Sequence, residues 1–355
     1  MDVENIFSQV ENIVELQPDS AIILLDSILY PEDLRKSQWN KYTLLQVQAK
    51  DKSYRDIASD TVIFAVKNYY LQKKNFRNAA LAAFYSGRVY QSRNDFKQAI
   101  SAYLQAETIS QKTEDDKQKG LIQYFIGGAY YEHENYSEAI DHFIAAQQYF
   151  SRSSDNDKRE IQTLNIIGSS YFMQENRDSA FIYFNKALQL AKAYNDTVVD
   201  KELESTIHLN LAHLYYELQQ KDSANFYFNT ALDFFEANDK ISSLSNAYNL
   251  FSQLEEKGGN YRKALEYHQK HTQYLETIIG EIENNSLREI KRKYHLKKIR
   301  NEKDRLLIKR QWIFLDFLII LLVVGIISFY LYSKNLQEEA IRLKMEIWHK
   351  LGIKP

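Results

Sequence analysis

Small and aromatic residues recur at fixed intervals in the segment from Phe125 to Phe150. The positions that define the pattern are Gly127, Tyr130, Ala139, Phe143 and Ala146. Positions without a large side chain let two helices approach closely, and the rings fill the space that the small residues leave. Residues 134–136 supply a turn between the two halves of the segment. The pattern therefore predicts two α-helices packed against each other as a hairpin.

The same spacing recurs four more times, and the intervals between successive copies are 40, 41, 44 and 40 residues. The other copies are Gly87, Tyr90, Ala99, Tyr103 and Ala106; Gly168, Tyr171, Ala180, Phe184 and Ala187; Ala212, Tyr215, Ala224, Phe228 and Ala231; and, in degraded form, Ser252, Glu255, Ala264, His268 and His271. Five copies in phase resemble the tetratricopeptide repeat (TPR) family, whose pattern these positions match one by one. The resemblance implies an all-α fold, a TPR-type α-solenoid in which helical hairpins form a right-handed superhelix.

The repeat pattern divides the chain into five segments. They are a divergent N-terminal helical cap formed by a partial repeat (1–75), five TPR-like hairpins (76–275), a long basic helix (276–311), a transmembrane helix (312–332) and a short polar helical tail (333–355). Apolar residues from Leu275 onward recur at spacings of 3 to 5, which suggests a coiled coil and a homodimer through 276–311. The heptad lapses at Lys297, so a single solvated helix is the alternative.

The segment from Trp312 to Tyr332 has 18 apolar residues out of 21, with aromatic residues at both edges. A helix of this length spans roughly 30 Å, which is the thickness of the apolar core of a bilayer. A buried core helix is the other interpretation, but we expect too little chain beyond this segment to cover it. The sequence therefore predicts a single membrane span.

Charge is distributed unevenly along the chain. Residues 1–287 hold 29 Lys and Arg against 40 Asp and Glu, whereas residues 288–310 hold 11 against three. An acidic array argues against nucleic-acid binding by the solenoid. Because the chain has no cysteine, disulfides, thiolate catalysis and Cys-based metal sites are excluded.

No catalytic motif accompanies the repeats. A Gly-rich phosphate loop, H-E-x-x-H and G-x-S-x-G are all absent. His268 and His271 share a helix face at i, i+3, but they occupy positions of a degraded repeat and are interpreted as structural rather than as metal ligands. We therefore expect no enzyme activity, no cofactor and no metal.

In the TPR family the first helix of each hairpin lines a concave groove, and the resemblance carries this groove onto ten positions of the present chain. They are Tyr85, Arg88, Tyr124, Tyr131, Asn165, Phe172, Asn210, His213, Tyr216 and Asn249. Asparagines can bond the backbone of an extended segment while rings pack its side chains, so the expected partner is a peptide or protein. Two alternatives stay open: some of the rings face the next repeat, or the array is the structural scaffold subunit of a membrane-associated assembly.

Two arguments on membrane orientation conflict. Seven Lys and Arg lie in the 15 residues before Trp312 and three in the 15 after Tyr332, which by the positive-inside rule predicts a cytoplasmic, tail-anchored array. The arrangement also resembles bacterial membrane-anchored TPR sensors and regulators without their output domain. That resemblance implies the inner membrane, a periplasmic array and a signal peptide missing from this chain. We favour the periplasmic orientation and keep the cytoplasmic one as the alternative.

Overall fold

The computed structural model describes residues 2–152, 158–193 and 198–350, and every regular element in these ranges is helical. The first elements are α1 (Val3–Ile13), α2 (Pro18–Asp26), the 3-10 helix η1 (Pro31–Asp33), α3 (Lys36–Lys52) and α4 (Ile63–Gln72). The following ones are α5 (Phe76–Ser92), α6 (Phe96–Ser110), α7 (Asp116–Glu132), α8 (Tyr136–Phe150), α9 (Lys158–Met173), α10 (Arg177–Ala193), α11 (Val198–Glu217), α12 (Lys221–Ala237), α13 (Ile241–Lys257) and α14 (Tyr261–Lys350). The chain forms two compact units, Met1–Asn285 and Ser286–Pro355.

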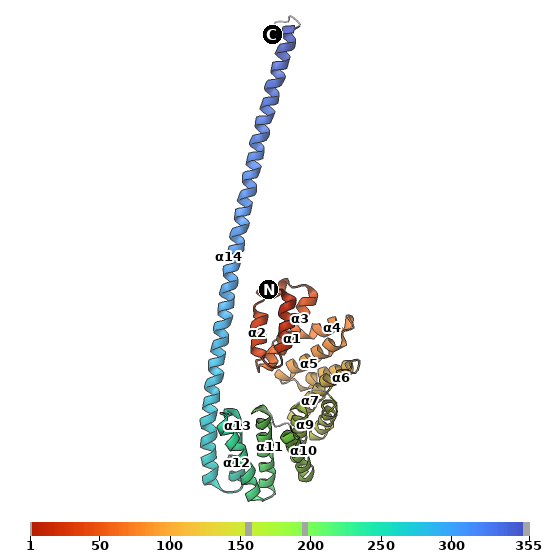
Figure 1. Ribbon diagram of the computed structural model, residues 1–355, viewed down its shortest axis with the longest axis vertical. Coiled ribbons are helices and arrows are strands. Elements are labelled where there is room, and N and C mark those ends of the chain that lie inside the picture. The colour runs from red at the N-terminus through yellow and green to blue at the C-terminus, as the bar shows by residue number, and fades with distance from the viewer. Residues whose placement is uncertain (1, 153–157, 194–197, 351–355) are drawn as a thin grey trace. The chain divides into compact units, whose positions relative to one another are not determined.

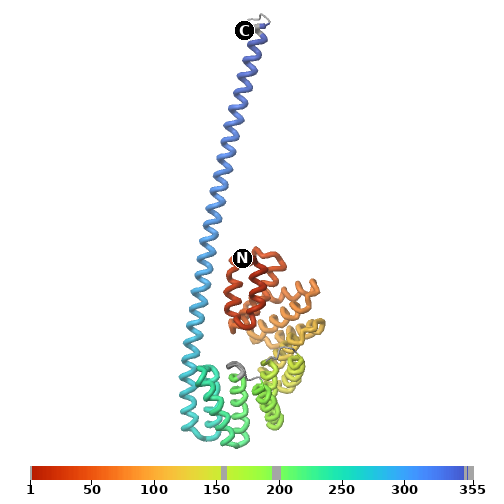
Figure 2. Tube along the Cα trace, viewed as in Figure 1, coloured from red at the N-terminus to blue at the C-terminus, as the bar shows by residue number. Residues whose placement is uncertain are grey.

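The first unit is a stack of helix pairs. Each of the pairs α5/α6, α7/α8, α9/α10 and α11/α12 packs as a hairpin and contacts the next pair along the chain (Figures 1 and 2). The degraded fifth repeat is also paired, because Ser252 Oγ in α13 donates to the carbonyl oxygen of Ala264 in α14 at 2.9 Å. Residues 1–75 form two further pairs, α1/α2 and α3/α4. The predicted TPR-type solenoid is therefore confirmed.

The repeated glycines lie where the two helices of a hairpin cross most closely. A Cβ atom added to Gly127 would lie 2.8 Å from Cδ1 of Phe143, and one added to Gly168 would lie 2.6 Å from Cδ1 of Phe184. Phe143 and Phe184 are almost fully buried. The glycine and the ring are thus two halves of one packing contact, which explains why they recur at the same distance in the sequence.

The hairpin turns repeat in the same phase as the glycines. In each turn one residue has a positive φ, at Asn94, Glu134, Glu175, Gln219 and Gly259. The next residue donates its backbone N–H to a carbonyl five positions earlier, for example from Asn135 to Tyr130 at 3.0 Å. This hydrogen bond is the C-terminal cap of a Schellman motif, which requires the left-handed conformation of the preceding residue. Only the last copy meets that requirement with glycine.

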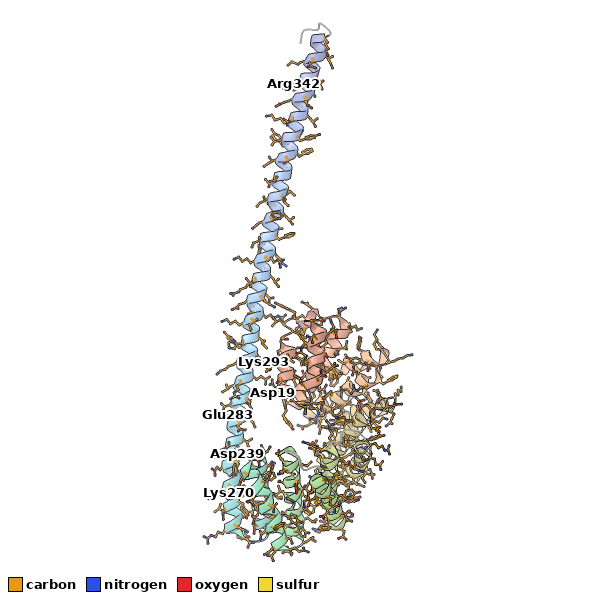
Figure 3. The ribbon with its side chains drawn as sticks, in the orientation of Figure 1. Asp19, Asp239, Lys270, Glu283, Lys293 and Arg342 are labelled. Atoms are coloured by element: carbon orange, nitrogen blue, oxygen red, sulfur yellow. The ribbon has the colours of Figure 1, made fainter. Side chains whose placement is uncertain are left out.

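The second unit consists of the continuation of α14. The helix shows no break between the segments predicted as juxtamembrane, membrane-spanning and tail, and residues 351–355 of the predicted tail lie outside the described residues. Its side chains project on all sides, as Figure 3 illustrates with Lys293 and Arg342. Within the described residues, α14 is the one helix long and apolar enough to cross a membrane, and its most apolar stretch is not buried.

Candidate functional site

The first helices of four consecutive pairs share a cavity of about 270 Å³, here called the inner pocket. Its lining includes Asp51 of α3, Arg88 of α5, Leu121, Tyr124 and Phe125 of α7, and Arg159 of α9. A larger hollow of about 500 Å³ also contacts Leu121 and Arg159 and extends to α1. The helices that the resemblance assigns to the groove therefore do enclose a recess.

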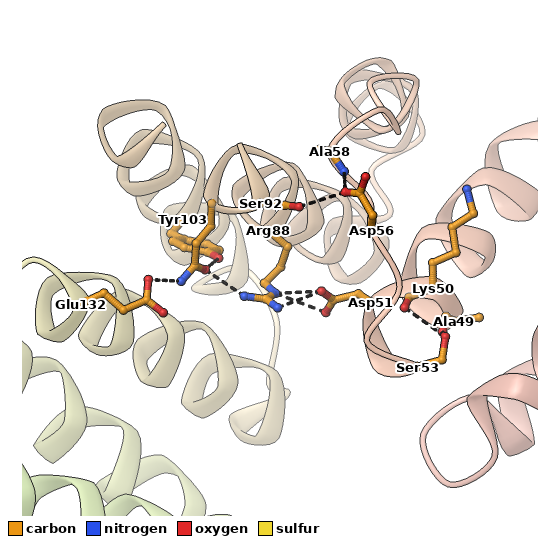
Figure 4. Close-up of polar contacts among 11 residues, drawn as sticks. Ala49, Lys50, Asp51, Ser53, Asp56, Ala58, Arg88, Ser92, Tyr103 and Glu132 are labelled. Carbon is orange, nitrogen blue, oxygen red and sulfur yellow. Dashed lines mark hydrogen bonds and ion pairs between the residues drawn. The ribbon is translucent and has the colours of Figure 1, made fainter. Parts of the chain in front are cut away.

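Arg88 belongs to a hydrogen-bond network that extends over four helices beside the inner pocket (Figure 4). Its guanidinium lies 2.9 Å from the Asp51 carboxylate, and its Nη1 donates to Gln91 Oε1 at 2.9 Å. Gln91 in turn donates to Glu132 of α7 at 2.6 Å and accepts from the Tyr103 hydroxyl at 2.7 Å. Arg88 thus joins α5 to α3 directly and to α6 and α7 through Gln91, and these contacts fix its position before any ligand arrives.

A second ion-pair cluster lies where the two hollows meet. Glu15, in the turn after α1, accepts from Lys52 of α3 at 2.9 Å and from Arg159 of α9 at 3.4 Å. Burial alone would raise the pKa of Glu15, but the charge of Lys52, with hydrogen bonds from Lys52 and Gln48 and the charge of Arg159, lowers it below its ordinary value. Glu15 is therefore charged at neutral pH and holds both cations in place.

Tyr124 supplies an aromatic wall of the inner pocket. Its ring lies 5.8 Å from that of Phe125 and 5.5 Å from that of Phe143, and burial raises the pKa of its hydroxyl above the usual value. Phe125 also stacks under Arg88, with 4.8 Å between the guanidinium carbon and the ring centroid. The pocket therefore offers aromatic surface next to a positively charged edge.

The structure places the ten predicted groove residues in different environments. Arg88 and Tyr124 line the inner pocket. Tyr85 is completely buried, because α3 and α4 also pack against α5 and cover the face on which it lies. That residue belongs to the core and cannot contact a ligand. Tyr131 packs its ring against Tyr136 at the start of α8.

The predicted asparagines contact each other rather than standing free. Asn210 Nδ2 of α11 donates to Asn165 Oδ1 of α9 at 2.9 Å, and both residues are partly buried. A hydrogen bond from a peptide to either amide would therefore have to replace the bond between them. The physical reason for this bond is that the adjacent first helices α9 and α11 lie side by side, so one amide can satisfy the other.

The remaining predicted positions also contact other residues of the array. The rings of Phe172 and His213 lie 4.5 Å apart across α9 and α11. The Tyr216 hydroxyl donates to the carbonyl oxygen of Leu254 in α13 at 3.0 Å, and Asn249 accepts from Gln253 at 3.3 Å. The alternative that some of these rings face the next repeat is thus correct for Phe172 and His213.

Two kinds of pocket residue were not predicted from the sequence. Asp51 and Lys52 lie in α3, which carries no recognisable repeat, and Arg159 lies near the start of α9, outside the groove positions of the family. Arg88 and Asp51 have opposite charges, but no pattern in the sequence predicts that they form an ion pair. Among the described residues no group of three His, Asp or Glu is placed to hold a metal ion. His271 Nδ1 lies 2.9 Å from Ser245 Oγ.

Comparisons with known proteins agree with this fold. The family model of the tetratricopeptide repeat matches residues 118–193 and 161–237. No curated protein matches the chain in sequence. The family match and the stack of helix pairs show that the chain contains tetratricopeptide repeats.

Three solved structures are similar to it. The apo form of RapI has a TM-score of 0.60 at 19% identity, over 78% of this chain and 77% of that one. Aspartyl phosphate phosphatase F from Bacillus subtilis has a TM-score of 0.53 at 17% identity, over 78% and 75%. The Rap conjugation gene regulator of plasmid pLS20, in complex with the Phr* peptide, has a TM-score of 0.51 at 17% identity, over 78% and 75%. At these identities the likeness concerns the fold.

Proposed function

We propose that this protein is a membrane-anchored adaptor or sensor that binds a peptide or protein segment on the first helices of its repeats. The observation that carries the proposal is the inner pocket, where Tyr124 and Leu121 offer apolar surface beside the fixed charges of Arg88 and Asp51. A recess of this kind suits one anchoring side chain of an extended segment. The complex of a similar structure with the Phr* peptide supports a peptide as the ligand class.

The role proposed here is binding rather than catalysis. One similar structure is named a phosphatase, but at 17% identity the likeness does not carry that activity to this chain. The charged groups of the inner pocket are engaged with one another, as in the pair Arg88–Asp51 and the pairs of Glu15 with Lys52 and Arg159. Such pairs fix the shape of a binding surface.

Site-specific cross-linking in cells tests the binding site. A photoreactive amino acid placed at Tyr124 should capture a partner, whereas the same group at Phe226 should not, because Phe226 is an exposed residue of a second helix. Leu121→Asp, which puts a charge on the apolar wall, should then reduce capture from position 124. Equal capture from both positions, or capture unaffected by Leu121→Asp, would contradict the proposed site and favour the structural-scaffold role.

We further propose that residues 312–332 cross a membrane once, in a bacterial inner membrane with the array in the periplasm. Deleting 312–355 should move the protein from a carbonate-resistant pellet to the soluble fraction. Protease added to intact spheroplasts should digest the array in the periplasmic orientation and spare it in the cytoplasmic one. A full-length chain that is soluble without detergent would rule out the span.

A homodimer through 276–311 completes the proposal. Ile279 and Ile282 are exposed on α14, at spacings that suit a partner helix. Because the chain has no cysteine, Ile282→Cys introduces a single thiol for disulfide trapping. A cross-linked dimer with Ile282→Cys, and none with a thiol at the opposite-facing Asn284, is the expected result. Equal trapping at both positions would indicate random collision instead.

A further inference from the structure

The second helices carry a separate hollow that the proposed peptide site does not use. An open groove of about 650 Å³ lies between α4 and α6. Leu71, Ile100 and Leu104 form its apolar surface, and Lys67 and Lys97 are among its lining residues. All residues that line it belong to the described part of the chain, and none of them carries a carboxylate.

The groove lies in a segment whose charge is opposite to that of the array. Residues 61–113 hold eight Lys and Arg against two Asp and Glu, although residues 1–287 as a whole hold 29 against 40. A positive surface within an acidic body attracts acidic partners selectively, since like charges repel them elsewhere on the array. The segment that forms the groove is therefore basic, although the unit as a whole is acidic.

Repeat packing does not require these lysines. Lys97 lies two residues before Ala99, and the same position in the next three repeats holds Ser137, Asp178 and Asp222. All four copies form the same hairpin. The lysine on the α6 side of the groove is thus specific to one repeat.

The shape of the groove fits a helix. On α6 its lining residues are Lys97, Ile100, Ser101, Leu104, Gln105, Thr108 and Ile109, which form one stripe at helical spacing. Twelve residue steps of helix extend over roughly 18 Å, or about three turns. Lys67 Nζ donates to Gln105 Oε1 at 2.5 Å and so joins the two walls. A smaller cavity of about 100 Å³, also lined by Lys67, Ser101 and Gln105, adds depth toward α5.

From these observations we infer that the groove between α4 and α6 docks an acidic amphipathic helix of a partner protein. The apolar face of that helix packs on Leu71, Ile100 and Leu104, and its flanking carboxylates bind Lys67 and Lys97. Helix-in-groove recognition needs such an apolar floor with charged edges. A flat lipid surface would not enter a recess between two helices. This docking site is separate from the inner pocket, so a partner helix can bind there whether or not the inner pocket binds a peptide.

The test uses the full chain in nanodiscs of neutral lipid and a labelled, designed helical peptide of about three turns. The peptide carries leucines on one face and glutamates beside them, and binding is measured by fluorescence anisotropy. Lys67→Glu with Lys97→Glu should weaken binding about tenfold or more, because two close opposite charges become like charges. The control, Lys73→Glu with Lys74→Glu, makes the same change in net charge outside the groove lining and should weaken binding no more than about twofold.

Three results would overturn the inference. The first is that the wild-type protein does not bind the designed peptide, because the inference requires this binding directly. A peptide of the same composition, scrambled so that its leucines no longer share a face, should bind far more weakly, and equal binding would mean attraction by charge alone. If the groove variant and the control variant weaken peptide binding equally, the attraction is again by charge alone. If the peptide fails while vesicles containing anionic lipid co-float with the protein through Lys67 and Lys97, the surface faces lipid instead.

Discussion

Two adjacent glycines of α7 offer a sharp test of the proposed hairpin packing. A Cβ at Gly127 would lie 2.8 Å from Phe143 Cδ1 and 3.1 Å from the carbonyl oxygen of Ala139, whereas a Cβ at Gly128 would meet nothing within 4 Å. Replacing glycine by alanine inside a helix stabilises it by about 1 kcal/mol when space is free. Gly128→Ala should therefore raise the melting temperature of the array.

Gly127→Ala has the same gain in helix propensity, but it also forces the two helices apart. Overpacking of this kind costs about 1–3 kcal/mol, so the two variants should differ by that amount in the free energy of unfolding. For a domain of this size class each kcal/mol corresponds to roughly 2–4 °C. Near-ultraviolet circular dichroism of the full chain in detergent follows tertiary packing around the tyrosines and measures both melting temperatures.

A second substitution separates packing from other causes. Phe143→Leu removes ring atoms that the new Cβ would touch, so it should be less costly in the Gly127→Ala background than in the wild type. The reasoning is refuted if Gly127→Ala and Gly128→Ala change the melting temperature equally. Additive effects of Gly127→Ala and Phe143→Leu would refute it as well.

Three further predictions concern single contacts. Asn165→Ala and Asn210→Ala should each lower the free energy of unfolding by about 0.5–1.5 kcal/mol, and the double variant should lower it by less than the sum. Urea unfolding of the wild type and the three variants measures these values. Additive costs would mean that the hydrogen bond is absent in solution. Glu134→Gly should raise the melting temperature because φ is 60° there, whereas Glu132→Gly inside α7 should lower it. Burial lowers the pKa of His208 to about 4, so the unfolded chain binds the proton more readily between about pH 6.5 and 4. Stability should therefore fall as the pH drops through that window, and His208→Gln should make the urea midpoint less dependent on pH.

The repeat architecture could be predicted from the sequence because its signals are local. Gly127 and Phe143 belong to one hairpin, and their spacing is fixed by two helices and one turn. The left-handed turn residues, from Asn94 to Gly259, repeat at the same intervals as the glycines, although four of the five are not glycine. A pattern of this kind identifies pairs of helices whatever surrounds them.

The contacts between pairs could not be predicted in the same way. Tyr85 lies two residues before Gly87 and is completely buried, whereas Tyr124 lies three residues before Gly127 and lines the inner pocket. Asn165 and Asn210 occupy neighbouring repeat positions, and the sequence does not say whether a ligand or another amide satisfies them. Asp51 comes from a helix pair without repeat signature, so its ion pair with Arg88 has no counterpart in the sequence pattern.

The paired charges also decide how the inner pocket should be probed. Asp51 is only 10% exposed and its carboxylate is held by Arg88. Removing Arg88 would leave a nearly buried charge without its partner, a change that costs about 3–5 kcal/mol. Loss of binding by such a variant would then report loss of structure. Leu121 and Tyr124 carry no charge that another residue needs, and a ligand gains most from covering their apolar surface. Substitution at Leu121 therefore leaves the buried ion pair intact, which substitution at Arg88 cannot do.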